Sequence, residues 1–463
     1  MNDSLPADLN AILTNTPELS GAYLVGGCVR DWLLGEAVKD YDVEVFGLDY
    51  ETLAKALARW GKVDLVGRSF GVIKLTTPDR NTYDFSIPRR DSKSGIGHKG
   101  FAVTFDPNLR LEEAAARRDF TINSIMYDPR ERRLIDPFRG EADLRARILR
   151  HTSSAFPEDP LRVLRGMQFA ARFDLAAANE TIDLSRSTKA TYPELAKERV
   201  REEWFKWAEK SRKPSRGLEF LAATEWIEHF PELNAIMGVP QDPEWHPEGD
   251  VFVHTAHCCD AMASLDDWKK SDAETRIVYM LAVLTHDFGK AVKTVEAAKR
   301  GEMRIVSPGH EEASGSLAGT FLERINTPNS IRERVIPLVV NHMAHFQQVS
   351  DRAVRRLAKR LAPENISGLV TLMTADSFGR PPLPREVPES VRLIAEKAEE
   401  LAVREEPPTA ILLGRHLLER GFQPGKELGR VLNAAYEAQL AGEFFDLEGA
   451  LTWVKNAAEI NKR

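Results

Sequence analysis

Residues 24–45 read LVGGCVRDWLLGEAVKDYDVEV, and the rest of the chain is interpreted around them. An apolar run ends in Gly26 and Gly27, where a backbone without side chains lets a phosphate group approach closely. A helix-like segment follows, and the stretch closes on Asp40 and Asp42 inside a predicted strand. Because alternate residues of a strand face the same side, both carboxylates are expected on one face. Such a pair suits Mg²⁺ that also binds substrate phosphates, although two solvated acids would give the same pattern.

The composition is that of a globular protein with several domains. The chain has 463 residues, of which 43% are hydrophobic and 29% charged, so about three or four domains are expected. The sequence contains no apolar run of about 18 residues and begins without a secretory signal, so no membrane association is expected. Cys28, Cys258 and Cys259 fit neither a zinc knuckle nor a disulfide framework, which indicates a reducing, cytoplasmic setting. The net charge of -7 still allows a local basic groove.

Two kinds of pattern divide the chain. Up to about residue 140, strand-like runs and helices mix without regular spacing, which predicts a small mixed α/β domain. From Asp143 onward, apolar residues recur at helical spacing. Proline-containing breaks at 242–247 and 380–384 mark further boundaries. The predicted fold class is α+β, with an antiparallel-rich sheet in the head followed by all-helical segments. The predicted segments are 1–140, 141–245, 246–380 and 381–463.

Polar groups follow the predicted strands. Residues 89–100, RRDSKSGIGHKG, indicate a mobile loop that is either functional or simply exposed. Arg117, Arg118 and Asp119 place two guanidinium groups beside a carboxylate, which suits phosphate and ribose groups. The same arginines would also offset the dipole at the end of a helix. Asp84, in a neighbouring strand-like run, is either a third metal ligand or an exposed acid.

Residues 158–165 read EDPLRVLR and support two interpretations. Asp159 before a proline is typical of a helix cap. Asp159, Arg162 and Arg165 also lie three residues apart, on adjacent turns of one helix face. An acceptor and a donor side by side would hydrogen-bond the edge of a nucleobase as another base does. Both interpretations remain open and are compatible with each other.

A third group of polar residues lies downstream in predicted helices. Neutral imidazoles and carboxylates together suit a divalent metal ion that activates water for phosphate ester hydrolysis. His257 and His345 are nearby alternatives that the sequence does not rank. The candidate ligands are His254, His286, Asp287, His310, His342 and Asp376.

These motifs have a counterpart in a known family. GG-x-VRD…D-x-D, RRD-FTIN and EDPLRVLR, in this order, resemble the class II tRNA nucleotidyltransferases of the DNA polymerase β-like superfamily, whose core bacterial poly(A) polymerases share. The similarity is close over about residues 20–240. WHPEGDVFVHT…THDFGK resembles the HD phosphohydrolase domain of bacterial members, and GRHLLERGFQPGKELGRVLNAAYEAQLAGEF resembles the tail of members that carry it. The predicted segments then correspond to head, neck and body, HD domain and tail.

The resemblance implies roles for individual residues. Asp40 and Asp42 would hold Mg²⁺ ions for catalysis. Asp31 would support the residues that contact the triphosphate, and Asn123 would help to hold the site at the ribose. Residues 89–100 would correspond to the loop needed to switch from C to A addition, and residues 198–202 to a helix that steadies the nucleotide site. The residues expected to bind nucleotide are Gly26, Gly27 and Arg30 at the triphosphate, Arg117, Arg118 and Asp119 at the ribose, Asp159 and Arg162 at the base, and Arg165 at phosphate.

The resemblance also implies an activity, addition of CCA to the 3′ end of tRNA from CTP and ATP. Poly(A) addition, partial addition of A or CC only, and an HD hydrolase with an RNA-binding N-terminal half are the alternatives. The HD domain would bind Mg²⁺, Ni²⁺ or Mn²⁺ and hydrolyse a 2′,3′-cyclic phosphodiester, a 2′-nucleotide or another phosphate ester. The oligomeric state is not predicted. Basic residues expected either along the tRNA backbone or on solvated helix faces are Arg145, Arg147, Arg150, Lys206, Lys210, Arg212, Lys213 and Arg216.

Overall fold

The computed structural model describes residues 5–65, 71–93, 101–299 and 301–460. The chain forms two compact units, Met1–His229 and Phe230–Arg463. Within the described ranges, no helix is both long and apolar enough to cross a membrane. The division into four segments predicted from the sequence remains a prediction.

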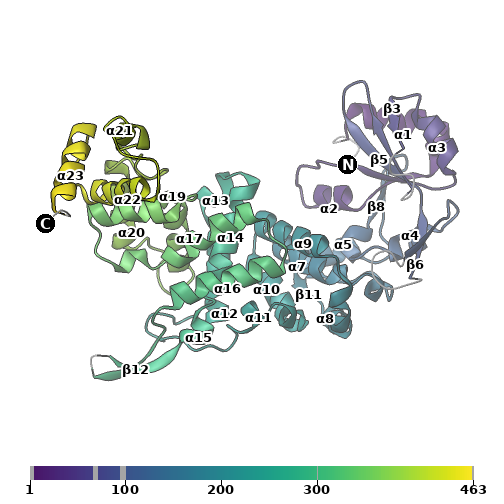
Figure 1. Cartoon of the computed structure of the whole chain (residues 1–463). Helices are drawn as coiled ribbons and strands as arrows, with labels where there is room; N and C mark the ends of the chain where they lie inside the picture. Colours follow the sequence, from purple (N-terminus) through teal and green to yellow (C-terminus); the bar gives the residue numbers. More distant parts are fainter. Residues whose placement is uncertain (1–4, 66–70, 94–100, 300, 461–463) are drawn as a thin grey trace. The chain divides into compact units, whose positions relative to one another are not determined.

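A seven-stranded mixed sheet forms the head of the first unit (Figure 1). Its order is β3-β4-β5-β2-β1-β8-β9, and only the β2–β5 pair is parallel, so the expected antiparallel-rich sheet is confirmed. The strands are β1 (Ala22–Val25), β2 (Asp42–Val45), β3 (Lys62–Asp64), β4 (Val72–Thr76), β5 (Thr82–Ser86), β8 (Met126–Asp128) and β9 (Arg133–Ile135).

The two faces of the sheet have different chemistry. Helices α1 (Ala7–Asn15) and α3 (Tyr50–Leu57) pack on one face, where Val43 and Val45 of β2 are buried among apolar side chains. Since side chains alternate along a strand, Asp42 and Glu44 of β2 face the other way. On that side α4 (Leu111–Ala116) contributes to a smaller apolar cluster. The site is therefore built on the face of the sheet opposite the main core.

The segment expected to be a mobile loop is partly regular. Strands β6 (Arg89–Lys93) and β7 (Phe101–Phe105) pair antiparallel as a separate ribbon, so a loop beginning directly after Pro88 is wrong. Residues 94–100 of that prediction lie outside the described residues. Ladder hydrogen bonds within the ribbon supply the regularity that the glycine- and charge-rich sequence did not suggest.

The first unit also contains helices within and after the head. They are α2 (Gly27–Leu33), α5 (Thr121–Ser124), α6 (Gly140–Ala146), α7 (Leu161–Phe173), α8 (Asn179–Ser187), α9 (Lys197–Lys210) and α10 (Pro214–Ala223). Two-residue strands β10 (Ile148–Leu149) and β11 (Ala176–Ala177) pair in parallel. Helix α7 is the centre: a Cβ on Gly166 would lie 2.9 Å from the ring of Phe220 and 3.1 Å from that of Phe120. This close packing joins the RRD segment to the helical part.

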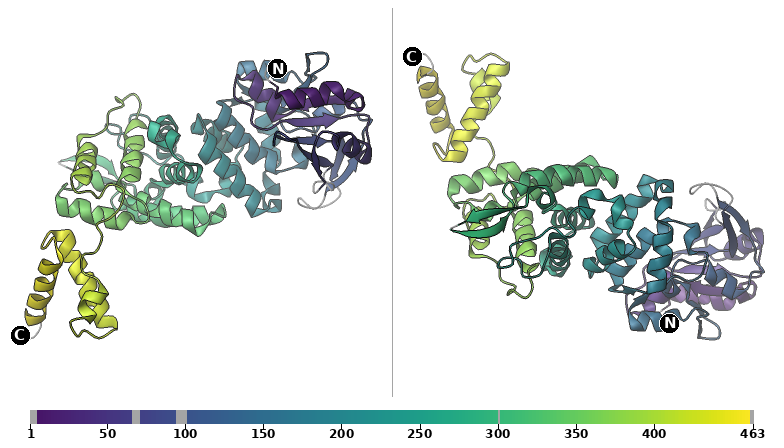
Figure 2. Two further views of the ribbon diagram at one scale, coloured as in Figure 1. Left: turned by 90° about the horizontal axis from the view of Figure 1, so that it is seen from above. Right: turned by 90° about the horizontal axis from the view of Figure 1, so that it is seen from below.

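Among its described residues, the second unit is helical apart from one hairpin (Figure 2). Strands β12 (Val295–Lys299) and β13 (Glu302–Val306) pair antiparallel, which corrects the expectation of helices only. Helices α22 and α23, drawn in yellow, pack with α21 around a small core of their own. The helices are α11 (Pro231–Asn234), α12 (Val251–Ser264), α13 (Asp266–Lys270), α14 (Ala273–Thr285), α15 (Lys290–Lys293), α16 (His310–Arg324), α17 (Asn329–Asn341), α18 (Asp351–Leu361), α19 (Ile366–Phe378), α20 (Glu389–Glu400), α21 (Gly414–Leu418), α22 (Lys426–Ala441) and α23 (Leu447–Ile460).

Candidate active site and metal centre

Acidic side chains gather on the open face of the sheet. Asp42 of β2 is the register partner of Asp84 of β5, so the two carboxylates stand on adjacent strands. Strand β2 begins at Asp42, which leaves Asp40 just before it rather than inside the strand as predicted. Desolvation raises the pKa of Asp42; Asp84, Asp40 and Glu44 also raise it, against the opposing charge of Arg118. A divalent cation would relieve this repulsion.

The carboxylate cluster fits a hard cation. Oδ1 of Asp84 is buried and has no hydrogen-bond partner among the described residues, and its nearest cation is Lys74, with Nζ 3.7 Å away. Carboxylate oxygens that lack donors are the ligands that Mg²⁺ prefers. The structure thus brings Asp84 beside the D-x-D pair, while its role as a ligand stays a prediction.

Glu44 is the residue that the sequence interpretation missed. Its side chain is fully buried, accepts a hydrogen bond from Arg117, and accepts another from Arg118 at 3.2 Å. Burial would raise the pKa of Glu44, but the two guanidinium groups hold it below its ordinary value. The available signal was the two-residue spacing from Asp42, which puts Glu44 on the same face of the strand.

The glycine turn lies directly beside these arginines. Gly26 has φ 71° and precedes α2, a left-handed conformation that favours glycine. A Cβ on Gly26 would lie 2.9 Å from a terminal nitrogen of Arg118. One on Gly27 would be 3.5 Å from the guanidinium of Arg30. The predicted phosphate-binding glycines and arginines therefore do meet.

A buried polar chain connects the motifs. The guanidinium of Arg30 donates to Asp31 at 2.8 Å and to the Asn123 carbonyl, and it lies 4.4 Å from the ring centroid of Phe173. Asn123 donates in turn to Asp119 at 2.9 Å. Arg30 therefore holds Asp31 and Asn123 in place. Its predicted contact with the triphosphate remains a prediction.

This series of buried polar contacts ends on helix α7. Arg165 donates to Asp119 at 2.7 Å, so its guanidinium faces that carboxylate in this structure rather than an open phosphate site. Burial would raise the pKa of Asp119, but Arg165 and the hydrogen bond from Asn123 lower it below its ordinary value. The ring of Phe169 lies under the same guanidinium, 5.1 Å from centroid to Cζ.

The start of α7 shows how the EDPLRVLR motif is held. Asp159 accepts from the backbone N–H of Leu161 at 3.0 Å, a capping contact made from one residue before the N-cap position, which is Pro160 rather than Asp159 as predicted. Its second oxygen accepts from Arg199 of α9 at 3.3 Å, inside the segment expected to steady this region. Arg162 donates to the carbonyls of Ala155 and Arg117, each at 2.7 Å, rather than to Asp159. Whether Asp159 and Arg162 read a base stays a prediction.

The basic residues considered for the tRNA backbone are largely ion-paired. Arg147 and Arg216 share Asp174 at 3.2 and 3.4 Å, and Arg212 reaches Glu36 at 2.6 Å. This pattern is typical of solvated helix faces, the alternative given above. The remaining pairs are Arg145 with Glu141, Arg150 with Asp143 and Glu180, Lys206 with Glu203, and Lys210 with Glu209, while Lys213 has an interaction of its own.

The second unit gathers the predicted histidines in one buried cluster. His254 lies on α12, His286 directly after α14, His310 at the start of α16 and His342 directly after α17. Three of them have Nδ1 within 2.8 Å of a backbone carbonyl, those of Val283, Ser307 and Val339. His254 instead has Nδ1 2.7 Å from Glu248. In every case Nε2 is left facing inward, as in metal sites where an outer partner fixes the tautomer.

Three ligand sets emerge among the described residues, two at the inward-facing Nε2 atoms and one at the edge of the cluster, formed by His246, Glu248 and His254. In each set the donor atoms all lie within 4.8 Å of one another, which fits a bound cation. Asp287 connects the two inward-facing sets, because its Oδ2 is 3.3 Å from His286 Nε2 and its Oδ1 is 3.3 Å from His310 Nε2. Nε2 of His286 is buried without a hydrogen bond among the described residues. The two inward-facing sets are His254, Cys258, His286 and Asp376, and Asp287, His310 and His342.

The charged groups of this buried cluster shift the pKa values of one another. Burial would raise the pKa of Asp287, but His286 and Lys290 hold it well below the ordinary range. Burial alone would lower the pKa of His254, yet Cys258, Asp376 and Glu248 hold this pKa well above its ordinary value. Burial and the charge of His286 lower the pKa of His342 to about 3.

Other groups complete or border this centre. Among the described residues, neither His257 nor His345 belongs to a ligand set; Nδ1 of His345 is 3.2 Å from the sulfur of Met373. Glu248 was missed, and it contacts His246 at 2.9 Å as well as His254. Burial would raise the pKa of Glu248, but these two contacts lower it to about 2. The signal for Glu248 was its place in HPEGD, just before the histidine-bearing helix.

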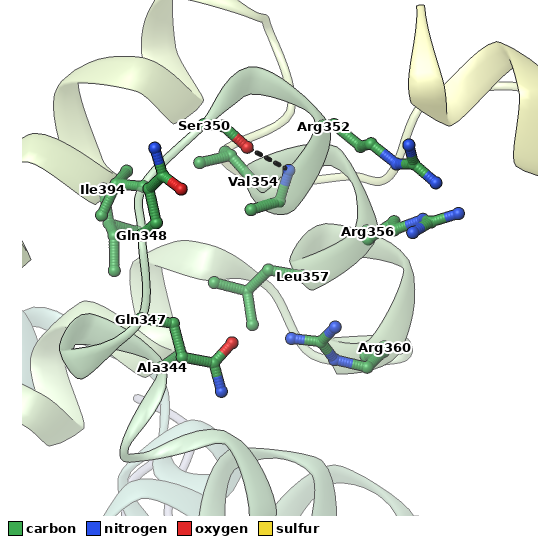
Figure 3. Close-up of a pocket in the computed structure, with 12 residues that line it drawn as sticks. Ala344, Gln347, Gln348, Ser350, Arg352, Val354, Arg356, Leu357, Arg360 and Ile394 are labelled. Carbon is green, nitrogen blue, oxygen red and sulfur yellow. Dashed lines mark hydrogen bonds between the residues drawn. The ribbon is translucent and has the colours of Figure 1, made fainter.

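A separate pocket of about 240 Å³ lies along α18 (Figure 3). Arg352, Arg356 and Arg360 recur every fourth residue along the helix and line this pocket together with apolar Leu357. Arg356 pairs with Glu437 at 3.0 Å. None of the predicted site residues lines this pocket.

Comparisons with known proteins bear on these sites. The family model described as the poly(A) polymerase head domain matches residues 22–150. The multifunctional CCA protein of Methylobacillus flagellatus is 36% identical over 369 residues, covering 77% of this chain and 84% of that protein. That of Halorhodospira halophila is 38% identical over 375 residues, covering 77% and 83%. The chain belongs to the CCA-adding enzyme and poly(A) polymerase family. As a member, it is a nucleotidyltransferase, and the family implies dependence on a divalent metal ion.

Solved structures of this family share the fold. The Bacillus stearothermophilus CCA-adding enzyme in complex with CTP has a TM-score of 0.64 and 19% identity, with 99% of each chain covered. The Thermotoga maritima CCA-adding enzyme complexed with tRNA has a TM-score of 0.61 and 18% identity, with 98% of this chain and 97% of that one covered. The resemblance read from the motifs is thereby confirmed for the family and its fold.

Proposed function

We propose that this nucleotidyltransferase adds CCA to the 3′ end of tRNA, using CTP and ATP as substrates and Mg²⁺ as its metal. One observation carries the proposal: strand β2 presents Asp42 to the open face and, through Glu44, holds Arg117 and Arg118 beside it. The relatives named as multifunctional CCA proteins support the choice of CCA addition over poly(A) addition. A tRNA substrate also agrees with the cytoplasmic setting predicted from the sequence.

The residues divide the work between chemistry and selection. Bound Mg²⁺ supplies Lewis-acid activation of the tRNA 3′-hydroxyl and neutralises charge on the triphosphate. Asp42 and Asp40, with Asp84 beside them, would hold it. Arg117 and Arg118 are kept in place by Glu44, so they would orient the nucleotide without having to be ordered on binding.

Selection of the base is assigned to the start of α7. Asp159 still has acceptor capacity beyond its contacts with Leu161 and Arg199, because a carboxylate has about four lone-pair sites. Arg162 is oriented by two carbonyls and has further N–H groups to donate. Together they would present an acceptor and a donor to the base edge, so the protein would serve as its own template.

The decisive experiment uses tRNA that lacks its 3′-terminal CCA. The wild type is expected to incorporate two C and one A when given CTP and ATP, and nothing when given UTP or GTP. Asp42→Ala is expected to abolish incorporation, whereas Asp183→Ala on the exposed face of α8 should retain it. Long A tails on unrelated RNA would contradict the proposal and favour poly(A) addition.

A second activity is supported by the cluster of inward-facing imidazoles in the second unit. We propose that this HD-type centre holds a divalent metal and hydrolyses a phosphate ester, for which 2′,3′-cyclic nucleotides are the first substrates to test. Four histidines whose Nδ1 atoms are already engaged carry this proposal, because such an arrangement frees every Nε2 for a metal.

A further inference from the structure

Cys258 lies among the metal-ligand candidates of the second unit. It follows His254 by one helical turn on α12, and its Sγ is 3.3 Å from Nε2 of that histidine. The side chain is completely buried. Nε2 of His254 is also 3.1 Å from Oδ1 of Asp376. Sulfur, imidazole nitrogen and carboxylate oxygen therefore converge on one point.

The position of the thiol is fixed by its surroundings. Sγ lies 3.7 Å from the backbone carbonyl of Asp376, to which the thiol donates. Gly379, three residues later, packs directly against it: a Cβ on Gly379 would lie 2.3 Å from Sγ. A larger residue there would displace the sulfur, so the absence of a side chain at Gly379 leaves the thiol its place beside His254.

The separations match a coordination shell. Ligand atoms about 2.0–2.3 Å from a tetrahedral zinc-like ion lie roughly 3.3–3.8 Å from one another. The distances of 3.1 and 3.3 Å around His254 Nε2 are close to this range. His286 belongs to the same set, which therefore offers two imidazoles, one thiol and one carboxylate. Asp287 borders it, with Oδ2 3.3 Å from His286 Nε2 and 3.6 Å from His254 Nε2.

We infer that Cys258 is a metal ligand of the HD-type centre and that the set His254–Cys258–His286–Asp376 selects a thiophilic divalent ion such as Zn²⁺ or Co²⁺ over Mg²⁺. The thiol releases its proton to solvent when the metal–sulfur bond forms, since the thiolate is the ligand. Thiolate and imidazole donors favour such metals, whereas Mg²⁺ prefers oxygen ligands in an octahedral arrangement. This inference rests on the proposed metal centre and adds a ligand and a metal preference to it.

The other inward-facing ligand set provides an internal contrast. Asp287, His310 and His342 offer nitrogen and oxygen donors without sulfur. A cobalt ion bound there would show ligand-field bands but no sulfur-to-metal charge transfer. A charge-transfer band therefore reports on the set that contains Cys258.

Cobalt spectroscopy tests the inference on the full chain. The protein is stripped with a chelator and titrated with Co²⁺, and a sulfur-to-cobalt charge-transfer band is expected in the near ultraviolet. Cys258→Ser should remove this band and weaken Co²⁺ and Zn²⁺ binding by about tenfold or more, the loss that even an outer partner can cause. Cys259→Ser is the matched control, because Cys259 is equally buried but belongs to no ligand set among the described residues, and it should keep the band.

A second measurement requires no variant. X-ray absorption at the cobalt edge of the loaded wild type should show one sulfur neighbour at about 2.3 Å. Cobalt bound with only nitrogen and oxygen neighbours would overturn the role of Cys258 and leave the metal centre standing. A protein that binds no cobalt would overturn both, and CCA addition by the first unit would be unaffected in either case.

Discussion

Asp119 accepts the Nε–H of Arg165 at 2.7 Å, across 46 residues of chain. The pair joins the RRD segment, expected at the ribose, to the helix expected to select the base. Asp119 is buried and also accepts from Asn123, so its carboxylate depends on both donors. Geometry at one motif is thus transmitted to the other by this pair, together with the hydrogen bond from Arg162 to the carbonyl of Arg117.

Removing the cation of this pair should destabilise the first unit. Arg165→Met would leave the Asp119 charge buried without its main partner, which costs about 3 kcal/mol. The midpoint of the first transition in urea denaturation should fall accordingly. Arg172→Met on the same helix is the control and should have a smaller effect, because Arg172 approaches its nearest acid, Asp31, only to 3.9 Å. Equal losses in both variants would contradict this account.

The same pair predicts a pH dependence of stability. The pKa of Asp119 is lowered in the folded protein from its ordinary 3.8, so the ionised form is the one that folding favours. Its contribution is complete above the ordinary pKa and is lost as the pH falls through the lower folded value. The stability difference between wild type and Asp119→Asn should therefore be constant from pH 7 to about pH 5 and shrink below it. Denaturation series at several pH values measure this difference, and a gap that widens on acidification would have the wrong sign.

Glu44 should matter for activity although it is not expected to touch substrate. Glu44→Gln keeps the shape but removes the charge that holds Arg117 and Arg118. Nucleotide addition should fall by about tenfold or more, because each lost charge-assisted bond is worth roughly 1.5–3 kcal/mol. Steady-state addition assays with CTP measure the loss. Glu112→Gln, an exposed acid on α4, should behave like the wild type.

Asp159 should separate folding from base choice. Asp159→Ala removes a capping contact worth about 1 kcal/mol and also the proposed acceptor for the base. The variant should remain folded at 25 °C but lose discrimination between CTP or ATP and the other nucleotides. Incorporation of each of the four nucleotides into CCA-less tRNA measures this ratio. Unchanged selectivity in a folded variant would assign Asp159 to capping alone.

The two proposed activities should be separable. His286→Ala removes a ligand from one unit of the chain, so phosphohydrolysis and metal content should drop while nucleotide addition persists. The measurements are release of product from 2′,3′-cyclic nucleotides and metal analysis of the purified protein. Loss of nucleotide addition in a folded His286→Ala protein would count against independent sites.

The sequence predicted those parts of the site that depend on local spacing. Asp42, the glycine turn and the His-Asp pair follow from local spacing and motif order, whereas Asp40 lies just before the strand that was expected to contain it. The partners of those residues did not follow, because they come from tertiary contacts. Arg165 was expected at phosphate but faces Asp119. Cys258 was counted only as a cysteine, although its spacing of four from His254 on a helix was visible.

Fold details failed for a related reason. The β12–β13 hairpin is largely exposed and strand β6, RRDSK, is polar, so the regularity of the hairpin and of the β6–β7 ribbon comes from pairing rather than from a recognisable apolar pattern. Their sequences lack the alternation that marks a half-buried strand. Mixed strands up to residue 140 and the helices beyond it were correctly expected, apart from the β10–β11 pair and the β12–β13 hairpin, because their apolar faces form the cores.

The contact between Phe120, Gly166 and Phe220 has a consequence for how the chain can be cut. A fragment ending at residue 150 would contain the whole matched head domain. It would nevertheless expose the ring of Phe120 and leave the Asp119 carboxylate without Arg165. The same requirement applies during synthesis, because the RRD segment can reach its folded structure only after α7 and α10 have left the ribosome. The smallest autonomous piece of this enzyme therefore extends well past its head.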